Sequence, residues 1–599
     1  MNTVHIVPRE VTQAKLDKRA KAATRHRASQ TYTLTDRVEE SAALYADRPC
    51  ILSNKSQFTY AQTNQHINQV AHAGHALGLK MGDVVGLCME NRPAFLFLWL
   101  GLSKLGVKLV FLNTNVSGKP LAHAIEVTGA NLIVMGEECL GLIEKTELPA
   151  NIQFWLWPDD VNMASASLRD RCALNFELVC QTASIENPPS AWREGLFAGE
   201  PALYIFTSGT TGLPKAAIIS HARWLITGDV MQITMDVQND DCFYCFLPLY
   251  HGAASLSAGA TAFASGASLL LRRKFSRTEF WSEVRHHSVT ICQYVGEICR
   301  FLLTAPPKPN DKEHSLRKMV GAGLAPEVWE QWVERFGDFE IYEGWGSTES
   351  NTNTINVDNR LGSCGRVPFW EKTNLRLVRY DFETDTHVRD ENGFLQLCGP
   401  NEVGEGIGMI INMPDVVGGR FEGYTSAEAT ENKILRNVFR EGDAWWSSGD
   451  LLRCDEDGYC WFVDRVGDTF RWNSENVSTL EVADVLGDFP GLESITVYGV
   501  KVPGAEGRAG MAALVLQRGT VFDAAKFWAL ATSRLPSYAA PLYLRLATTA
   551  DMTGNYKLRK VDLQREGYDA HLVTDPLFAR DDKCQTYRPL KVGELSAVG

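Results

Sequence analysis

One segment of the sequence, Tyr204–Ala217 (YIFTSGTTGLPKAA), carries residues suited to binding an anion. An apolar run leads into a loop that contains Thr207, Ser208, Gly209, Thr210, Thr211, Gly212 and Lys215. Glycine lets backbone N–H groups approach an anion closely, the hydroxyls add donors, and the lysine adds a point charge. The Walker A spacing G-x-x-x-x-G-K-[ST] is absent from this segment. The segment predicts a phosphate-binding loop of another kind, whereas an ordinary loop of this composition is a surface turn.

Further polar and glycine-rich segments follow along the chain. They are LPLYH (Leu247–His251), GAGL (Gly321–Leu324), GWGSTE (Gly344–Glu349), SGD (Ser448–Asp450), DRVGDTFRWNSENVSTLEV (Asp464–Val482) and TGNYKLRK (Thr553–Lys560). Taken singly, most have an ordinary structural explanation. His251 alone would more often be a hydrogen-bonded core histidine, and Lys557 alone a solvated residue at a helix start.

Alternating strands and helices must position these motifs. Strand-like runs are Val84–Met89, Lys108–Leu112, Asn131–Met135, Ala202–Phe206, Asp241–Leu247 and Ala267–Leu271. Helix-like runs between them include Tyr60–Leu77 and Phe275–His286. This alternation is typical of an α/β protein. Turn-rich β segments then run through Phe394–Val463.

A shorter unit follows near residue 464. It is predicted to contain helix Thr479–Gly487, strands Glu493–Val500 and Gly510–Leu516, and helix Asp523–Leu535. We expect two domains, 1–464 and 465–599, with the boundary at Asp464–Thr469. Gly467 is the expected backbone pivot because glycine tolerates large dihedral changes.

Composition limits the class of protein. The chain has 599 residues, 45% of them apolar and 22% charged, which is ordinary globular usage. The 59 Lys+Arg and 72 Asp+Glu residues give a net charge of −13, which argues against nucleic acid as the main partner. The N-terminus lacks an apolar signal segment. The apolar run Ala94–Leu102 is long enough for a buried helix but too short to span a membrane.

The basic segment Lys15–Arg27 and the cysteines bear on localisation. The basic segment could lie on an anionic bilayer, but a solvated surface helix is favoured because its apolar face is weak. The 14 cysteines are scattered, and most lie in apolar runs, as Cys88, Cys292 and Cys398 do. They are interpreted as buried thiols of a cytoplasmic protein that could associate peripherally with a membrane. Cys242 and Cys245 are interpreted in the same way.

The ordered motifs resemble those of the adenylate-forming superfamily over about residues 40–565. The amino-acid sequences of the segments DTFRW…ENVSTLEV and YGVKVPGAEGRAGMAAL (Tyr498–Leu514) are similar to those of the fatty acid transport protein and very-long-chain acyl-CoA synthetase group. The resemblance implies a large N-terminal adenylate-forming domain of β-sheets flanked by helices, with a small mobile C-terminal α+β domain. It also implies two half-reactions. ATP and a fatty acid give acyl-AMP and pyrophosphate, and coenzyme A then displaces AMP.

The resemblance implies a role for each motif residue. The phosphate loop, with Lys215, would hold the β- and γ-phosphates. Thr348 would donate to the α-phosphate, and Glu349 would bind Mg²⁺. Trp345 would lie on adenine, with Gly346 in the same site and Gly321, Ala322 and Gly323 passing close to the base. Asp450 would bind the ribose hydroxyls together with Arg465. Lys557 would be the adenylation lysine, and His251 would lie near the acyl carboxylate.

The sequence departs from the superfamily pattern at two positions. Gly467 stands where many members have Asp or Lys, and Ser474 stands where Gly is usual. The Ser474 side chain is expected to narrow the path of the pantetheine arm.

The resemblance leaves other functions open. One alternative is a membrane-associated fatty acid transporter, and another is a CoA ligase for a bile or aromatic acid. The lack of a spanning segment argues against a stand-alone channel.

Overall fold

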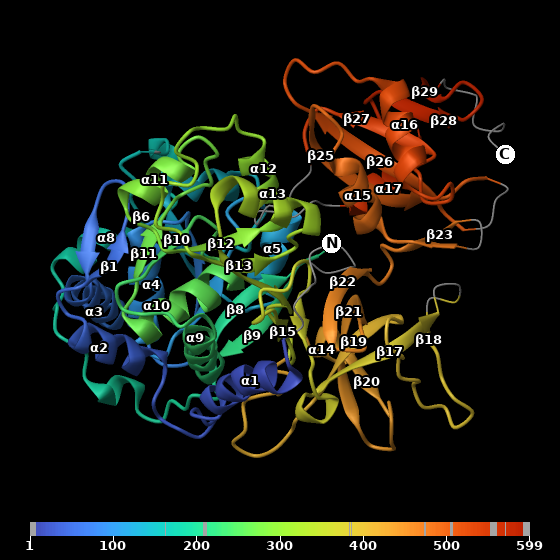
Figure 1. The fold of residues 1–599 in the computed structure, drawn as a ribbon. Coiled ribbons are helices and arrows are strands. Elements are labelled where there is room, and N and C mark those ends of the chain that lie inside the picture. Colours follow the sequence, from blue (N-terminus) through green and yellow to red (C-terminus); the bar gives the residue numbers. More distant parts are fainter. Residues whose placement is uncertain are drawn as a thin grey trace.

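Strands and helices alternate along most of the chain (Figure 1). The computed structural model describes residues 7–161, 163–207, 213–381, 384, 386–472, 475–503, 507–550, 560–569 and 571–590. The strands expected from the apolar runs are present as β3, β4, β5, β8, β10 and β11, whose bounds are given below. The α/β class is therefore confirmed.

The first large sheet carries several of the predicted motifs at its strand ends. Its order is β15 (Thr354–Ile355), β14 (Glu340–Trp345), β13 (Lys318–Ala322), β12 (Ile291–Val295), β10 (Cys242–Cys245), β11 (Ser268–Leu271), β1 (Pro49–Leu52) and β2 (Gln57–Thr59). The strands from β14 to β1 are parallel. Carboxyl ends of parallel strands share one edge, which brings GAGL after β13 next to GWGSTE at the end of β14.

The second large sheet carries the phosphate loop. Its order is β7 (Leu174–Asn175), β6 (Gln153–Trp157), β5 (Leu132–Gly136), β3 (Val84–Cys88), β4 (Lys108–Phe111), β8 (Pro201–Thr207) and β9 (Lys215–Ser220). Strands β8 and β9 pair antiparallel, with Thr207 opposite Lys215. The two ends of the predicted phosphate loop therefore lie side by side.

Helices fill the space around these sheets. The expected helices are α3 (Tyr60–Ala76), which packs on α4 (Pro93–Ser103), and α11 (Phe280–His286). The residues Ala94–Leu102 are all buried within α4, as predicted. Helix α11 begins five residues later than expected, because Ser276 opens a turn and Phe275 packs its ring against Phe246 and Phe280. A π-helix, η3 (Ala253–Gly259), follows the LPLYH motif.

A third sheet carries the SGD motif. Its order is β16 (Gly365–Arg366), β22 (Tyr459–Arg465), β21 (Ala444–Cys454), β19 (Val403–Met409), β17 (Leu375–Asp381) and β18 (Thr386–His387), with β20 (Ile434–Arg436) paired to β21. Strands β21 and β22 form an antiparallel pair in which Asp450 is opposite Arg465. This pairing joins SGD to the start of the expected hinge.

The elements beyond the hinge form a separate group, drawn orange to red in Figure 1. They are β23 (Phe470–Trp472), β24 (Glu475–Val477), α15 (Thr479–Gly487), β25 (Leu492–Val500), β26 (Ala509–Leu516), α16 (Ala524–Arg534), β27 (Tyr543–Ala547), α17 (Val561–Glu566), β28 (Leu577–Asp581) and β29 (Thr586–Pro589). One hydrophobic cluster is built around Leu486, Phe527 and Leu544 and uses only residues after 469. The group therefore has its own core beside the large one, as the sequence predicted for a smaller α+β unit.

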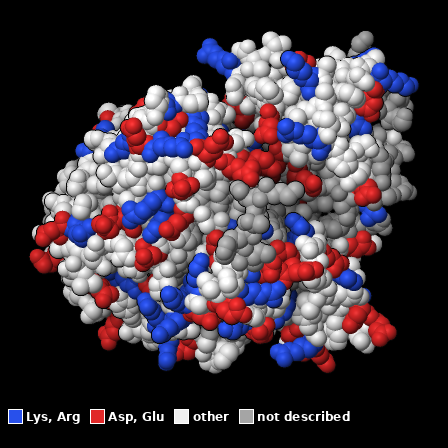
Figure 2. Space-filling view, viewed as in Figure 1, with Lys and Arg blue, Asp and Glu red and all other residues white. Residues whose placement is uncertain are grey.

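Acidic side chains gather where α13 (Pro326–Phe336) and α15 approach each other (Figure 2). Arg300, on α12 (Gly296–Leu303), forms an ion pair of 3.5 Å with Asp484 on α15. Burial raises the pKa of Asp484 to about 7, and Arg300 opposes that shift. The Arg300–Asp484 ion pair thus links the two parts of the chain.

The basic N-terminal segment forms a helix, α1 (Arg9–Ala23), that packs against α9 (His221–Met235). Thr12 Oγ1 donates to Asp358 Oδ2 at 2.5 Å, and Lys15 Nζ donates to Asp358 Oδ1 at 3.0 Å. Arg19 reaches Thr234 at 2.6 Å. Polar contacts hold this surface helix, in keeping with its weak apolar face.

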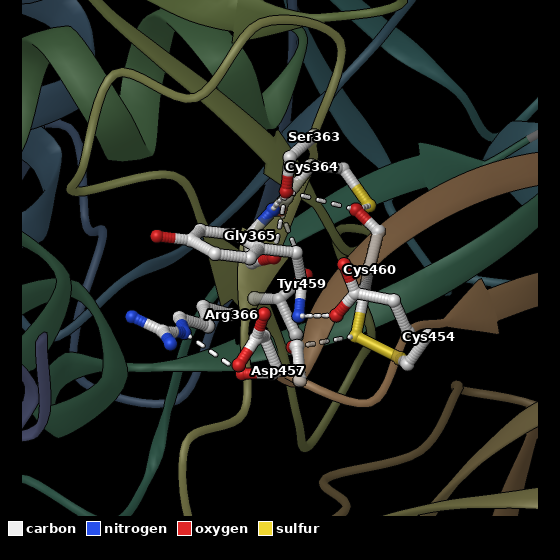
Figure 3. The surroundings of a disulfide bond; sticks show 11 residues. Ser363, Cys364, Gly365, Arg366, Cys454, Asp457, Tyr459 and Cys460 are labelled. Carbon is white, nitrogen blue, oxygen red and sulfur yellow. Dashed lines mark hydrogen bonds between the residues drawn. A yellow bond between two sulfur atoms is a disulfide. The ribbon is translucent and has the colours of Figure 1, made fainter. Parts of the chain in front are cut away.

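The expectation of thiols throughout is wrong at one place. Cys454 and Cys460 form a disulfide across the β21–β22 pair, with Cα atoms 4.1 Å apart (Figure 3). The two residues lie opposite each other in the antiparallel β21–β22 pair, although six positions separate them in the sequence. Cys88, Cys292, Cys242 and Cys245 are buried thiols as expected, and Cys398 is only half-buried. Burial raises the pKa of Cys242 to about 11 and that of Cys245 to about 12.

The helices of the described residues bear on whether the chain could span a membrane. None of the helices there combines the length and the apolar character needed to cross a bilayer.

Candidate active site

The two ends of the phosphate loop face a tyrosine from a distant loop. Thr207 ends β8, and Lys215 begins β9. The Lys215 Nζ lies 5.8 Å from the centre of the Tyr424 ring. Ser208, Gly209, Thr210, Thr211 and Gly212, which the sequence predicts to contact phosphate, lie outside the described residues. The positions of Thr207 and Lys215 nevertheless define the two ends of the loop.

Glu349 is a buried carboxylate with one oxygen held and one left over. The Tyr424 hydroxyl donates to Glu349 Oε1 at 3.0 Å, and Glu349 is 8% exposed. Its Oε2 is buried and has no hydrogen-bond partner among the described residues. Burial and the Glu349 carboxylate both raise the pKa of Tyr424, which keeps the phenol a donor. A buried carboxylate oxygen without a donor suits a cation.

Thr348 lies against the LPLYH segment. A Cβ atom on Gly252, the residue after His251, would lie 3.1 Å from Thr348 Oγ1. Arg223 donates to the backbone carbonyls of Thr348 at 2.6 Å and Ser350 at 2.7 Å. Ser220 caps the start of α9 by accepting from Arg223 N at 3.1 Å. The segment that contains His251 therefore lies next to Thr348, and Arg223 of α9 holds the loop that carries Thr348.

Trp345 and Asp450 meet at the end of the first sheet. The Trp345 indole Nε1 donates to Asp450 Oδ2 at 2.9 Å. Arg465 lies on the other side, with its Nε 3.6 Å from Asp450 Oδ1. Trp345 is 5% exposed and packs against Gly406, where an added Cβ would lie 3.1 Å from the indole. The three residues predicted to bind adenosine thus form one contact chain.

The GAGL loop is held by a buried glutamate. Glu343 Oε1 accepts from Gly323 N at 2.5 Å and from Leu324 N at 3.3 Å, while Tyr294 donates to Oε2. Gly323 has a φ of +81°, which favours glycine. A Cβ on Gly296 would lie 1.6 Å from Gly323 O, so this approach also requires glycine. Gly321 pairs with Glu343 in the sheet, so the loop runs beside Trp345 and Gly346.

The SGD motif lies within β21 and is held by the Glu405 carboxylate. Its Oε1 accepts from Ser447 Oγ at 2.6 Å and from Gly449 N at 2.8 Å, and its Oε2 lies 2.5 Å from His387 Nε2. Burial alone would raise the pKa of Glu405, but the His387 and Ser447 contacts outweigh it and hold the pKa below its usual value. An ionised Glu405 therefore fixes the part of β21 that carries Asp450.

Several of these positioning residues were missed from the sequence. Tyr424, Arg223, Glu343 and Glu405 belong to no expected binding role, although Glu343 precedes GWGSTE by one residue. Tyr424 lies 75 positions from its partner Glu349. A polar residue beside a motif was the only available signal, and it was present for Glu343 alone.

The arrangement can hold a polyanion attached to a flat ring and a diol. Glycine-rich backbone, Thr207, Lys215 and Glu349 lie near one end, and Trp345, Asp450 and Arg465 near the other. Lys557 and Ser474 lie outside the described residues. The roles of all these residues remain predictions.

A family model and several known proteins match most of the chain. The model of the AMP-binding enzyme family matches residues 38–406. The chain is 39% identical to long-chain fatty acid transport protein 2 of Rattus norvegicus, over 93% of this chain and 89% of that protein. It is 38% identical to long-chain fatty acid transport protein 6 of Mus musculus, over 89% and 85% of the two chains.

A solved structure shares the fold. The anthranilate CoA ligase AuaEII in complex with anthranoyl-AMP superposes with a TM-score of 0.75 at 20% identity, covering 92% of this chain and all of that one. The protein therefore belongs to the AMP-binding enzyme family, and within it to the group of the long-chain fatty acid transport proteins.

Proposed function

We propose that the protein is an AMP-forming ligase that joins long-chain or very-long-chain fatty acids to coenzyme A through an acyl-AMP intermediate. The observation that supports this most is the contact chain Trp345–Asp450–Arg465, together with the buried Glu349 carboxylate. The preference for long chains rests on the names of the relatives, which are 35–39% identical over most of the chain.

The chemical problem is the inertness of a carboxylate. Its carbon is a poor electrophile and its oxygen a poor leaving group, so transfer to a thiol needs activation. Attack of the carboxylate oxygen on the α-phosphorus of ATP forms the acyl–phosphate bond and releases pyrophosphate. The CoA sulfur then attacks the acyl carbon, and AMP leaves. Both steps gain from holding the reacting groups in line and offsetting their charge.

Residues of the large unit would bind and orient the nucleotide. The loop between Thr207 and Lys215 would take the β- and γ-phosphates, and Thr348 would donate to the α-phosphate. The adenine would lie against Trp345, beside the GAGL loop, and Asp450 would accept from the ribose hydroxyls. His251, in the segment that lies next to Thr348, would lie near the fatty acid carboxylate.

Mg²⁺ fits the residues present. Glu349 Oε2 is a buried oxygen without a donor among the described residues. Those residues contain no group of three or more potential His, Cys, Asp or Glu ligands, so a cation at Glu349 would depend on phosphate oxygens. That is the usual way in which Mg²⁺ is held in nucleotide sites. Bound there, the ion would offset the phosphate charge.

The small unit would supply the remaining groups. We place the boundary between residues 464 and 465 and the pivot at Gly467, whose φ of +86° and open surroundings permit rotation. Lys557 would contact the acyl carboxylate and the α-phosphate during adenylation. The segment around Ser474 would face the pantetheine arm in the second step.

Exchange of labelled pyrophosphate into ATP tests the choice of acid. Purified protein with Mg²⁺ should support exchange with palmitate and lignocerate and much less with benzoate or cholate. Addition of CoA should convert the same acids to thioesters. Preference for benzoate or cholate would make the protein a ligase for another acid class, and absence of exchange with every acid would contradict the proposal.

The names of the relatives also favour a role in fatty acid uptake. Conversion to the CoA ester removes free acid from the equilibrium and would drive net entry without a separate channel. Uptake in cells expressing the protein should then fall with ligase activity when Glu349 is replaced by Gln. Uptake that persists in an inactive variant would favour the transporter alternative.

A further inference from the structure

Lys433 lies against the part of β21 that carries Asp450. The residue is half-buried and immediately precedes β20. Its Nζ donates to the carbonyl of Ser448 at 3.0 Å, and its own carbonyl accepts from Ser447 N at 2.8 Å. A Cβ atom on Gly449 would lie 3.6 Å from the Lys433 Nζ. Backbone and side-chain contacts together therefore fix the ammonium beside the SGD motif.

The charges around Lys433 belong to the candidate active site. Burial lowers the pKa of Lys433, the carboxylates of Glu349, Glu405 and Asp450 oppose that shift, and Lys215 adds to it. Lys433 therefore lies among the predicted Mg²⁺ carboxylate, the predicted ribose carboxylate and the lysine of the phosphate loop. These are the charged groups that act on it from the loops and strands packed around it.

The Lys433 ammonium has N–H donors that its contact with Ser448 does not use. A lysine ammonium carries three N–H donors, and the Ser448 carbonyl takes one. Among the described residues, no carboxylate forms an ion pair with the Lys433 Nζ within 4.0 Å, although Glu349, Glu405 and Asp450 act on it electrostatically. A half-buried cation without a close counter-ion is costly unless a ligand supplies the anion.

We propose that Lys433 is a further substrate-binding residue, whose ammonium donates to an oxygen of the 5′-phosphate of the bound nucleotide. The inference rests on the proposed function, which puts the ribose at Asp450 and the phosphates at Thr348 and Glu349. The 5′-phosphate is the group that joins these two regions. Lys433 contacts the SGD motif of the ribose region and is also subject to the charges of Glu349 and Lys215 in the phosphate region.

The chemistry makes this phosphate a useful target. ATP, acyl-AMP and AMP all keep the 5′-phosphate, whereas pyrophosphate leaves after the first step. A cation bound to it acts in every nucleotide state of the cycle. It would tighten binding of ATP, acyl-AMP and AMP alike, and so would lower KM for ATP more than it raises kcat.

Binding of AMP and adenosine separates phosphate recognition from recognition of the ribose. Calorimetry should be run on the full chain as wild type, Lys433→Met, Lys433→Arg and the control Lys308→Met, which alters an exposed lysine. Loss of a charge-assisted hydrogen bond should weaken AMP binding to Lys433→Met by about 10-fold or more. Adenosine binding should change by less than about 2-fold on the same reasoning. Lys433→Arg should keep most of the AMP affinity, and Lys308→Met all of it.

Three results would overturn the inference. They are equal weakening of AMP and adenosine, unchanged AMP binding in Lys433→Met, and no AMP binding by the wild type. Thermal midpoints of all variants show whether Lys433→Met is folded, and if it is not, Lys433→Gln takes its place. Failure of the proposed function is distinguishable, because wild-type protein would then bind AMP in a Lys433-dependent way yet form no AMP from ATP with any acid.

Discussion

The Trp345 indole nitrogen donates a hydrogen bond of 2.9 Å to the Asp450 carboxylate, across 105 positions of sequence. Trp345 ends a strand of the first large sheet, and Asp450 lies within a strand of the third sheet. The bond joins the residue expected to contact the base to the residue expected to contact the sugar. It leaves the other carboxylate oxygen, Oδ1, facing Arg465.

Replacing Trp345 by Phe should keep an aromatic face but remove this bond. A hydrogen bond to a charged group contributes about 1.5–3 kcal/mol, so we expect KM for ATP to rise by roughly 10-fold. The rate constant kcat should change little, because the bond orients the nucleotide in every state. Steady-state kinetics with saturating fatty acid measures both, with Trp528→Phe, in the small unit, as the control. A fall in kcat with an unchanged KM would contradict this role for Trp345.

Removing the Tyr424 hydroxyl should affect Mg²⁺ dependence. Tyr424→Phe keeps the ring beside Lys215 but frees Glu349 Oε1, so the carboxylate loses its fixed orientation. We expect the Mg²⁺ concentration for half-maximal adenylation to rise by about 3- to 10-fold, the range of one ordinary hydrogen bond. Excess Mg²⁺ should restore most of the rate. Mg²⁺ titrations of Tyr424→Phe, with Tyr380→Phe as the control, measure the shift, and an identical titration curve would show that Tyr424 does not position Glu349.

Glu405 should stabilise the protein above its unfolded-state pKa. Its pKa is lowered in the folded state, so the contribution is present above the unfolded-state pKa and is lost as the pH falls below that value and through the lower folded pKa. Glu405→Gln should therefore lower the thermal midpoint at pH 7, with a difference from wild type that shrinks only as the pH falls from the unfolded-state pKa of glutamate, about 4.3, through the lower folded pKa. Exposed Glu441→Gln is the control. A difference in thermal midpoint that stays constant over this range would indicate that the ionised form of Glu405 is not what stabilises the SGD part of β21.

Thiol titration tests the disulfide. The sequence has 14 cysteines, and the pairing of Cys454 with Cys460 leaves 12 thiols. Denatured, unreduced protein should react with 12 equivalents of a thiol reagent, and fully reduced protein with 14. Peptide mapping should find the missing pair in the β21–β22 hairpin. Fourteen reactive thiols before reduction would show that the sequence-based expectation of thiols holds here after all.

Much of the fold was predictable because it depends on local pattern. Apolar runs such as Val84–Met89 and helical periodicity in Tyr60–Leu77 mark elements that the structure contains as β3 and α3. The order of the motifs also indicated the family. The start of α11 was misplaced because Phe275 joins an aromatic cluster before the helix begins, and side-chain packing of this kind leaves no periodic signal.

The candidate site was predictable only in part, for a physical reason. Residues that are expected to touch the nucleotide lie in contiguous motifs, and these could be found. Tyr424 and Glu405 act through side-chain contacts between distant segments. Lys433, which is proposed to touch the 5′-phosphate, lies outside every motif, so no local sequence pattern marks any of the three. The Cys454–Cys460 pair is a further case, because only the hairpin register makes the two residues neighbours.

The transfer of oxygen from acid to nucleotide tests the central claim most directly. Purified protein should be incubated with ATP, Mg²⁺, CoA and palmitate labelled with oxygen-18 in its carboxylate, and the nucleotide product analysed by mass spectrometry. If the carboxylate attacks the α-phosphorus, AMP is formed and carries one oxygen-18 atom per palmitoyl-CoA produced. Formation of ADP, or of AMP without the label, would contradict the acyl-AMP mechanism proposed for this chain.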